Sequence, residues 1–544
     1  MLILKKPARP HALGEPILHA DHPRPVTRRD MLSAGLVSVP AVVMAPAWLG
    51  ALLKSGRAGA ATLDPDLMPL KDPTQCNIAG ATGGLPFICF DLSGGANLVG
   101  SEVLVGVKGG QTNFLSTAGY GKLGLPGSMV PTSSAFVSSA LGLLWHSDGG
   151  ILRGILSKAT TPATAAGTNG AVICAMSQND TGNNPHNPMY GIAKAVGNDG
   201  TTTPKGSLLT LIGNQSTVSG GNSQAPMQLV DPTLQPTKIA TSQDDAGLVQ
   251  DTGSTVDPVA LEVLQSQARI SGGVGSYTAG SASGITGALT TPQGGVPGVQ
   301  LLSDPAADGA LKNNLRCAYV KSANTSIAFA GSPLDPTKDQ VISGGATPIF
   351  TATDFKDGDV QKTASVMKLV LGGYAAAGTI SMGGFDYHDS TRATGEQRNF
   401  KAGQMIGAVL EYAQRLGTPV MIYVFSDGSL SATSTVDSST NGRGKLGWQG
   451  DNQSTASTFF LVYSPKGRPT LRSGGPGQQL GYFSADGNVV TTSSPAANSV
   501  YQLVQTVILN YMGLTGSDQF FAQTFPKFTL GSAASGLVAF NPVV

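Results

Sequence analysis

The sequence predicts an α/β fold, with a mostly parallel central sheet flanked by helices and long loops rich in Gly, Ser and Thr. One observation and one packing rule lead to this prediction. Short apolar runs alternate along the chain with segments of helical periodicity. Strands that are buried on both faces and alternate with helices form largely parallel sheets. No internal repeat of about 20–50 residues is visible, which disfavours a solenoid or a propeller.

The predicted strands and helices follow from these two patterns. Each apolar run has the length of a buried strand, and the helical segments repeat their apolar residues every three or four positions. The strands are expected at Leu85–Leu92, Ala171–Met176, Leu208–Ile212, Thr379–Met382, Val420–Phe425 and Phe459–Tyr463. The helices are expected at Pro258–Ile270, Lys362–Tyr374, Gly395–Leu416 and Ser499–Tyr511.

The helix at 395–416 has the clearest boundaries. Thr394 and Gln397 have the spacing of a capping box at its start. Gly417 ends the helix, and Pro419 prevents its continuation. Its apolar face is formed by Met405, Val409, Tyr412 and Leu416.

Long connectors rich in Gly, Ser and Thr separate the predicted elements. They are expected at Ala159–Gly170, Ser271–Gly298 and Ser429–Thr455. Loops of this length are usually functional lids or flexible insertions. We expect one large α/β domain over residues 61–544, with residues 214–298 as a candidate insertion.

Composition excludes several classes of protein. Charged residues make up 12% of the 544 residues, and 72 residues are glycine. The charged fraction is about half the usual value, and the glycine fraction is about twice its usual value. This composition excludes a coiled coil and a highly charged disordered chain. The net charge is +1, but eight of the 34 basic and three of the 33 acidic residues lie in residues 1–60, so the remainder is near −4. A nucleic-acid partner is therefore not expected.

Residues 1–60 have the parts of a bacterial export signal. Arg28 and Arg29 precede an apolar stretch at Ala34–Leu53, and small residues follow at 58–60. A basic region, an apolar region and a small-x-small cleavage site form a secretory signal, and the arginine pair resembles a twin-arginine signal. The alternative is a transmembrane anchor, although two prolines interrupt the stretch. We expect cleavage near Ala60 and a periplasmic or extracellular protein without a permanent membrane span.

An exported protein can form disulfides, and four cysteines are available. Cys89 and Cys174 lie within apolar runs, which favours buried thiols. Cys76 and Cys317 could form a bridge, although the sequence does not fix the connectivity. No CxxC spacing suggests a zinc or redox motif.

The strongest candidate site follows the predicted strand at 379–382. Asp386 and His388 are two residues apart, so in extended backbone both side chains point to the same side and could bind one divalent cation. The next strand is followed by Asp427, a third carboxylate at the same sheet edge. Ligands bind at the carboxyl ends of strands in open α/β sheets. The alternative is that the acidic residues cap turns and His388 is a solvated loop residue.

Two further segments could contribute to this site. Asp91 could be a metal ligand and Ser93 a nucleophile, with glycines that let a phosphate or metal approach the backbone. The alternative is a tight turn with a serine hydroxyl bonded to its own backbone. His186 lies in a polar loop bracketed by prolines, where it could be a ligand, although Asx turns explain the composition equally well.

Two other polar groups favour structural roles. His146 lies in an apolar patch and is expected to be a hydrogen-bonded core histidine. Asp354, Asp357 and Asp359 loosely suggest calcium, but their spacing does not match the twelve-residue calcium loop. They are interpreted as a solvated turn before the helix at Lys362.

The order of these segments resembles the DUF1501 family of exported bacterial proteins, which is similar in fold to the alkaline phosphatase and sulfatase superfamily. The resemblance spans residues 85–463, and its most specific element is Gly-Gly-Phe-Asp-Tyr-His at 383–388. It implies a metal-centred α/β sheet that hydrolyses phosphate or sulfate esters. Asp386 and His388 match the family's Asp-x-His, His186 matches its Ser-His-Phe histidine, and Asp427 matches its Ser-Glu acidic position.

The chain also departs from this family. Gly-Gly-Ala-Asn at 94–97 stands where the family has Gly-Gly-Asn-Asp. The family's later Gly-Thr-Asp-His-Gly has only Gly-Asp-Asn at 450–452 as a remnant, without its histidine, and Ser429-Leu430 stand where an arginine is usual. It is open whether Asp451 replaces the missing ligand.

Two functions follow as hypotheses. In the first, Asp386, His388 and Asp427, with Asp91 and His186 as further ligands, hold a divalent cation, and Ser93 or a water molecule on that cation attacks a phosphate or sulfate ester. In the second, the protein is catalytically degenerate and acts with cell-envelope or secretion partners in structure, secretion or surface assembly. A carbohydrate or small-ligand binder is a third class without a motif of its own.

Overall fold

The computed structural model describes most of the chain from residue 84 onward. The described residues are 63–71, 76, 84–132, 135–177, 185–195, 197, 200, 209–213, 225–231, 234–248, 334–544 and nine single positions between 265 and 324. The export signal expected at 1–60, most of the candidate insertion and most of the helix predicted at 258–270 lie outside these residues. Among the described residues, no helix combines the length and apolar character needed to cross a bilayer.

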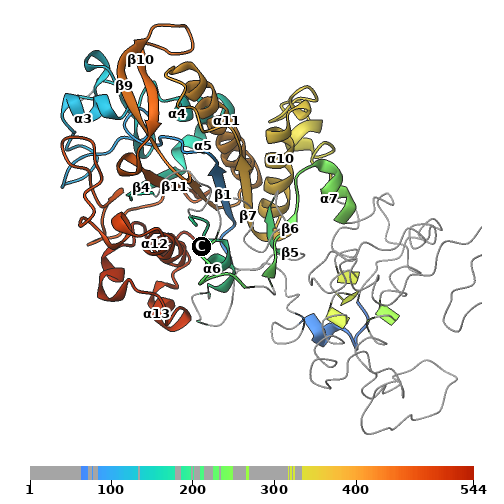
Figure 1. Ribbon diagram of the computed structural model, residues 1–544. Helices are drawn as coiled ribbons and strands as arrows, with labels where there is room; N and C mark the ends of the chain where they lie inside the picture. The colour runs from blue at the N-terminus through green and yellow to red at the C-terminus, as the bar shows by residue number, and fades with distance from the viewer. Residues whose placement is uncertain are drawn as a thin grey trace, which may run out of the picture.

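The core of the protein is an eight-stranded sheet with the order β12-β4-β11-β8-β1-β7-β5-β6 (Figure 1). All neighbouring strands are parallel except β11, which runs antiparallel to β4 and β8. The predicted α/β fold with a mostly parallel sheet is therefore confirmed. The strands are β1 Phe87–Leu92, β4 Thr168–Cys174, β5 Leu209–Gly213, β6 Thr237–Lys238, β7 Ala375–Met382, β8 Val420–Phe425, β11 Ser457–Tyr463 and β12 Gln479–Leu480.

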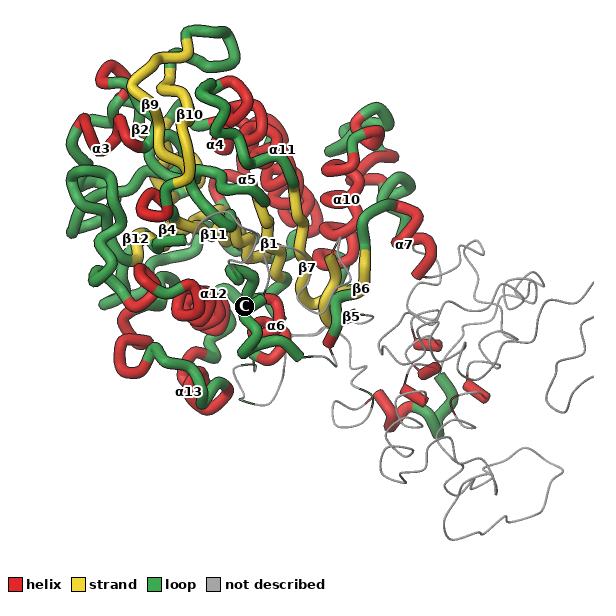
Figure 2. Tube along the Cα trace, viewed as in Figure 1, coloured by secondary structure: helices red, strands yellow, loops and turns green. Residues whose placement is uncertain are grey.

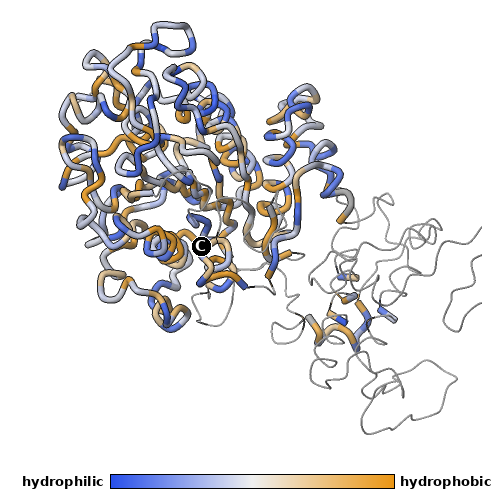
Figure 3. The backbone as a smooth tube through the Cα atoms, in the orientation of Figure 1, coloured by the Kyte–Doolittle hydropathy of each residue, from blue (hydrophilic) through white to orange (hydrophobic). Residues whose placement is uncertain are grey.

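Helices cover both faces of the sheet (Figures 1 and 2). Ile88 and Phe90 of β1 pack with α4, α10 and α11 on one face, whereas Phe87 and Cys89 pack with α6 and α12 on the other. The residues of α12 are largely apolar (Figure 3) because this helix is buried against the sheet. The α-helices are α3 Thr117–Lys122, α4 Gly150–Lys158, α5 Pro162–Ala166, α6 Met189–Lys194, α7 Ser242–Leu248, α10 Gly358–Leu371, α11 Ala393–Leu416, α12 Val500–Leu514 and α13 Phe521–Thr524.

Two antiparallel hairpins lie outside the central sheet. The strands β2 (Val137–Leu141) and β3 (Leu143–His146) form one, and β9 (Leu430–Asp437) and β10 (Lys445–Asp451) form the other. The second hairpin corrects the connector predicted at 429–455, because β9 consists largely of Ser and Thr residues that are only partly buried, so no apolar run marks the strand.

Other predictions need smaller corrections. The connector predicted at 159–170 contains α5 and the start of β4. Within the candidate insertion, β6 extends the main sheet by pairing with β5, and α7 contacts α10. The helix predicted from Lys362 begins earlier, at Gly358, so Asp354 and Asp357 precede α10 as expected but Asp359 lies in its first turn, and Asp357 caps the helix by accepting a hydrogen bond from the Asp359 amide at 2.9 Å.

The start of α11 differs from its prediction, whereas its end agrees. The helix begins at Ala393, so Thr394 cannot be its N-cap, and the Thr394 hydroxyl donates instead to Asp389. The cap comes from the hairpin, because Asp437 Oδ2 accepts hydrogen bonds from the Arg392 and Ala393 amides at 2.9 and 3.1 Å. Gly417 ends the helix in the left-handed conformation with φ of 64°, as the sequence indicates.

The cysteines behave as their surroundings predict. Cys76 and Cys317 form a disulfide. Cys89 on β1 and Cys174 on β4 are buried free thiols. Burial raises the pKa of Cys89 to about 12, so this thiol stays protonated and unreactive at neutral pH.

Candidate metal centre

Three adjacent parallel strands end at the same edge of the sheet. Asp91 of β1 is in register with Ser381 of β7 on one side and Phe425 of β8 on the other. The segments that follow these strands therefore start side by side, as the sequence analysis expected. They contain Ser93, the 383–388 segment and Asp427.

The turn after β1 is packed tightly against the segment after β7. The Ser93 amide donates to the Met382 carbonyl at 2.9 Å, and the Phe385 amide donates to the Ser93 carbonyl at 3.2 Å. Gly94 has φ of +126°, and a Cβ at this position would lie 2.4 Å from the Asp386 backbone nitrogen. Only glycine permits this approach, so Gly94 brings the Ser93 turn next to Asp386.

Side chains after β8 hold the same turn in place. Asp427 is 3% exposed, and its Oδ1 accepts a hydrogen bond from the Gly94 amide at 2.8 Å. The Ser426 hydroxyl accepts from the Gly95 and Ala96 amides at 3.1 and 2.7 Å and donates to a backbone carbonyl of β1. The amides of residues 94–96 thus point at the side chains that follow β8 rather than at a site for phosphate, and Ser426 has no motif that singles it out in the sequence.

Ser93 and Asp91 form a hydroxyl–carboxylate pair at the end of β1. The Ser93 hydroxyl donates to Asp91 Oδ2 at 3.0 Å. Asp91 is 1% exposed, whereas Ser93 is only half-buried. This differs from the alternative of a serine bonded to its own backbone, and it gives the hydroxyl a buried proton acceptor.

Alternating burial explains how the 385–388 segment presents its polar side chains. Phe385 and Tyr387 are buried, whereas Asp386 and His388 are exposed, as expected for extended backbone. The Tyr387 hydroxyl donates to Asn399 of α11 at 3.0 Å, and its ring lies 6.2 Å from that of Trp448. The two buried aromatic residues therefore fix the direction of the two exposed ligand candidates.

Asp451 is the third member of the cluster, and it arrives on the hairpin. The Trp448 amide of β10 donates to the Thr391 carbonyl, and the Ser390 amide donates to the Trp448 carbonyl, both at 2.9 Å. These hydrogen bonds hold β10 beside the segment that follows His388, and they place Asp451, the last residue of β10, next to the imidazole.

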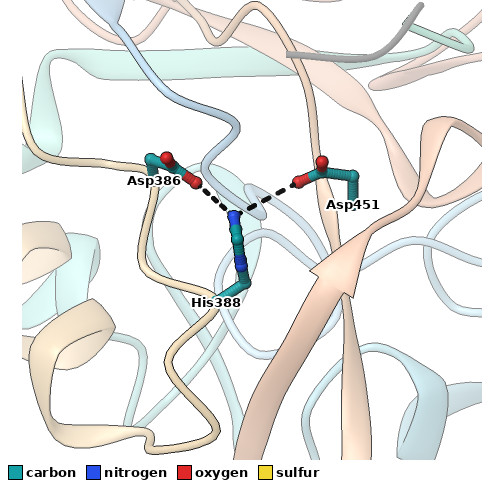
Figure 4. Close-up of side chains that lie close together, drawn as sticks. All are labelled: Asp386, His388 and Asp451. Atoms are coloured by element: carbon teal, nitrogen blue, oxygen red, sulfur yellow. Dashed lines mark ion pairs between the residues drawn. The ribbon is translucent and has the colours of Figure 1, made fainter.

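The three side chains converge on the imidazole of His388 (Figure 4). His388 Nε2 lies 2.6 Å from Asp386 Oδ1 and 4.0 Å from Asp451 Oδ1. One donor atom from each residue lies within 4.8 Å of the other two. We call Asp386, His388 and Asp451 the exposed triad.

The donor chemistry of the exposed triad fits a divalent cation. Two carboxylates and one imidazole suit zinc or manganese, and three protein ligands leave coordination positions open. Tetrahedral ligands at about 2.0–2.2 Å from a metal lie roughly 3–4 Å apart. The observed separations are close to this range, and exposed side chains can adjust to it.

The other predicted ligands lie elsewhere at this sheet edge. Asp91, Asp427 and His186 do not join the exposed triad, which is the only group of three or more such donors within reach of one another in the described part of the chain. Asp91 and Asp427 bind the Ser93 turn through the contacts given above. Sequence spacing shows which residues follow which strand, but not which way each side chain turns.

His186 is buried beneath the turn after β8. Its ring stacks on Phe425 with centroids 5.8 Å apart, and its Nε2 lies 3.2 Å from the Ser177 hydroxyl. That hydroxyl donates to the Asp427 carbonyl at 2.8 Å. Burial lowers the pKa of His186 to about 3, so the imidazole is neutral at physiological pH.

His146 is a core histidine, as predicted. It is fully buried, stacks on Phe136 and lies 3.0 Å through Nε2 from the Met129 carbonyl. Burial lowers its pKa to about 4. Its contacts are those of a structural residue.

Fold and site together define an α/β protein with a carboxylate–histidine cluster at the carboxyl edge of its sheet. No protein-family model, curated protein or solved structure matches the chain. Function is therefore inferred from the chemistry of the site itself.

Proposed function

We propose that this protein is an exported, metal-dependent hydrolase that acts on phosphate or sulfate esters. The observation that carries the proposal is the exposed triad, two of whose members follow β7 at the carboxyl edge of a parallel sheet, next to the strand whose end carries the half-buried Ser93. The resemblance of residues 85–463 to the DUF1501 family, with its alkaline phosphatase-like fold, supports the same reaction class. The arginine pair and apolar stretch in residues 1–60 support export to the periplasm or beyond.

Asp386, His388 and Asp451 would hold the cation. A divalent cation there would act as a Lewis acid that neutralises charge on a phosphoryl or sulfuryl oxygen. Exposure of the triad, with the Asp386 side chain 55% exposed, leaves room for a substrate from solvent.

Ser93 is the nucleophile in this proposal. Its oxygen would form the bond to phosphorus or sulfur while the ester bond to the alcohol breaks, and its proton would pass to Asp91, which already accepts its hydrogen bond. The alcohol would leave with a proton from solvent, and a water molecule would then release the phosphate or sulfate from Ser93. Asp427, Ser426 and Gly94 hold the turn that carries Ser93, so they position the nucleophile rather than react.

The decisive experiment combines metal analysis with activity. Protein purified without chelators should contain close to one equivalent of a divalent metal, or bind one Mn²⁺ or Zn²⁺ in calorimetry. It should hydrolyse p-nitrophenyl phosphate or p-nitrophenyl sulfate. His388→Ala should abolish both properties, whereas Asp486→Ala, which removes an exposed carboxylate outside the triad, should retain them. The proposal would be refuted if none of zinc, manganese, magnesium and calcium binds stoichiometrically.

A second candidate is a degenerate member of the same fold with a structural or surface-assembly role. The observation that favours it is that Ser426 and Asp427 are committed to the backbone of residues 94–96. This function predicts that Asp386→Ala leaves export, assembly and envelope-partner binding intact. A folded Asp386→Ala protein that loses ester hydrolysis would contradict it.

A further inference from the structure

An exposed arginine lies against the glycine that precedes the exposed triad. Gly384 has φ of +86°, and a Cβ there would lie 2.8 Å from Arg398 Cζ and 2.9 Å from Nε and Nη2. The guanidinium of Arg398, from the second turn of α11, therefore packs on the bare backbone of Gly384. Any larger residue would displace it, because neither the space nor the backbone conformation suits a side chain.

Arg398 differs from the other cations around it. On the same helix, Arg392 pairs with Glu396 at 2.9 Å, and Arg415 pairs with Glu411 at 2.9 Å. On α10, which packs beside α11, Lys362 pairs with Asp359 at 2.7 Å. The Arg398 guanidinium forms no hydrogen bond or ion pair with any described residue, and the side chain is exposed.

The position of this guanidinium matches an anion that approaches the triad. Gly384 is two residues before Asp386, so the two Cα atoms are at most roughly 7 Å apart. A guanidinium presents a planar fork of donors that binds two oxygens of a phosphate or sulfate. A divalent cation in the triad would offset the two carboxylates, and Arg398 adds a further positive charge that attracts an anionic substrate.

We infer that Arg398, packed on Gly384, forms an oxyanion subsite beside the exposed triad and binds the phosphate or sulfate group of the substrate. This inference rests on the proposed function and deepens it, because it assigns the substrate an anionic group with at least two free oxygens. Arg398 takes part in binding, and the cation ligands remain Asp386, His388 and Asp451.

The test measures the anion and the metal separately. Mn²⁺ binding is followed by electron paramagnetic resonance. Inorganic phosphate near the bound Mn²⁺ is followed by ³¹P relaxation, and sulfate is tested by its competition. Arg398→Gln should weaken phosphate binding by about tenfold or more, as expected for a lost charged hydrogen bond, while Mn²⁺ binds as tightly or more tightly. The phosphate affinity of Arg398→Lys should lie between those of the unaltered protein and Arg398→Gln, because lysine keeps the charge but lacks the planar fork of donors.

The matched control is Lys527→Gln, which removes an exposed cation after α13 and should leave both affinities unchanged. Unchanged phosphate and sulfate binding in Arg398→Gln would overturn the inference. If Mn²⁺ does not bind even the unaltered protein, the proposed function fails, and calorimetry with phosphate alone still decides the role of Arg398. Sulfate that competes better than phosphate would assign sulfate esters as the substrate class.

Discussion

The exposed triad and a buried charge cluster share the strand β10, yet they have opposite character. The buried charge cluster consists of Glu102, Arg392, Glu396 and Lys445, all 0–2% exposed. Glu396 Oε1 accepts from Arg392 Nε and Nη2 at 3.0 and 2.9 Å and from Lys445 Nζ at 2.8 Å. Glu102 accepts hydrogen bonds from Asn399 and from two amides at the start of α4.

Charge balance distinguishes the two regions. The buried charge cluster already contains two cations, Arg392 and Lys445, which share Glu396, whereas Glu102 is held by Asn399 and backbone amides and burial raises its pKa. Burial opposes ionisation of Glu396, but Arg392 and Lys445 outweigh it and lower its pKa. The exposed triad has two carboxylates around a single imidazole, so added positive charge is favourable there. We conclude that the buried cluster anchors the fold and that the triad is the region suited to a cation.

The two regions are joined by β10. Lys445, its first residue, is bound in the buried charge cluster, and Asp451, its last residue, belongs to the exposed triad. The buried cluster therefore anchors the hairpin that supplies the third ligand. Variants on the two sides should separate stability from cation binding.

The largest expected effect is on stability and follows from Glu396→Ala. Removing this carboxylate leaves Arg392 and Lys445 buried without their shared partner, which should cost about 3–5 kcal/mol of unfolding free energy. Urea denaturation measures the change. Gln397→Ala, at an exposed position on the same helix, should change stability by less than about 0.5 kcal/mol. Equal effects of the two substitutions would remove the distinction between a buried anchor and an exposed surface.

The second prediction concerns pH. Both His186 and His146 have folded pKa values below the unfolded value of about 6.5, so the unfolded chain binds more protons as the pH falls. The stability that depends on these two neutral imidazoles is fully present above pH 6.5. It is lost progressively as the pH falls toward 4, because protons then bind the unfolded chain preferentially. Each histidine should contribute up to about 1.4 kcal/mol per pH unit within that window.

Denaturation at several pH values between 4.5 and 6.5 measures this slope. His186→Asn should reduce it by about half, because one of the two buried imidazoles is removed. Phe425→Leu, which alters the ring stacked on His186 without removing a titrating group, should lower stability and keep the slope. An unchanged slope in His186→Asn would show that this imidazole does not stay neutral in the folded protein.

The third prediction tests the start of α11. Asp437→Ala removes the acceptor for the Arg392 and Ala393 amides and should cost about 1 kcal/mol. A hydrogen bond with the Ser439 side chain, together with those from the Arg392 and Ala393 amides, lowers the pKa of Asp437 to about 2, so the contribution is present above pH 4 and disappears as the pH falls toward 2. Thr394→Ala, at the position favoured by the sequence, should change thermal or urea stability much less. A larger loss of stability in Thr394→Ala than in Asp437→Ala would instead support the capping box predicted from the sequence.

The smallest expected change in stability is that of Asp386→Ala. Its side chain is exposed, so the unfolding free energy should change by less than about 0.5 kcal/mol without metal. Mn²⁺ affinity should nevertheless fall by about 100-fold. Loss of an outer-shell partner already lowers metal affinity by about 10–100-fold, and Asp386 is a direct ligand in the proposed site. A destabilised apo protein with unchanged Mn²⁺ affinity would place Asp386 in the scaffold rather than in the metal site.

Much of the fold could be predicted from local pattern. Buried strands such as β8 are continuous apolar runs, and the predicted limits of β8 match the observed ones. The β9–β10 hairpin was missed because only part of each strand is buried, and its Ser and Thr residues resemble a loop. The cap of α11 was missed because Asp437 lies 45 residues after Arg392, outside any local motif.

The candidate site was predicted in part, for the same reason. The pairing of Asp386 with His388 follows from the two-residue period of extended backbone. The roles of Ser426 and Gly94 become visible only when the ends of β1, β7 and β8 are placed together. Arg398 had no sequence signal, because its importance depends on the glycine beneath it.

The sequence alone determined a mostly parallel α/β sheet, the strand ends at which polar residues gather, and the Asp386–His388 pair. These depend on hydrophobic periodicity and backbone geometry, which act over a few residues. Only the tertiary structure decided that Asp451 completes the triad while Asp91 and Asp427 turn toward the Ser93 loop. That choice depends on hydrogen bonds between residues hundreds of positions apart, such as the one from the Gly94 amide to Asp427. Contacts at such separation form only after the chain has folded, and no local pattern encodes them.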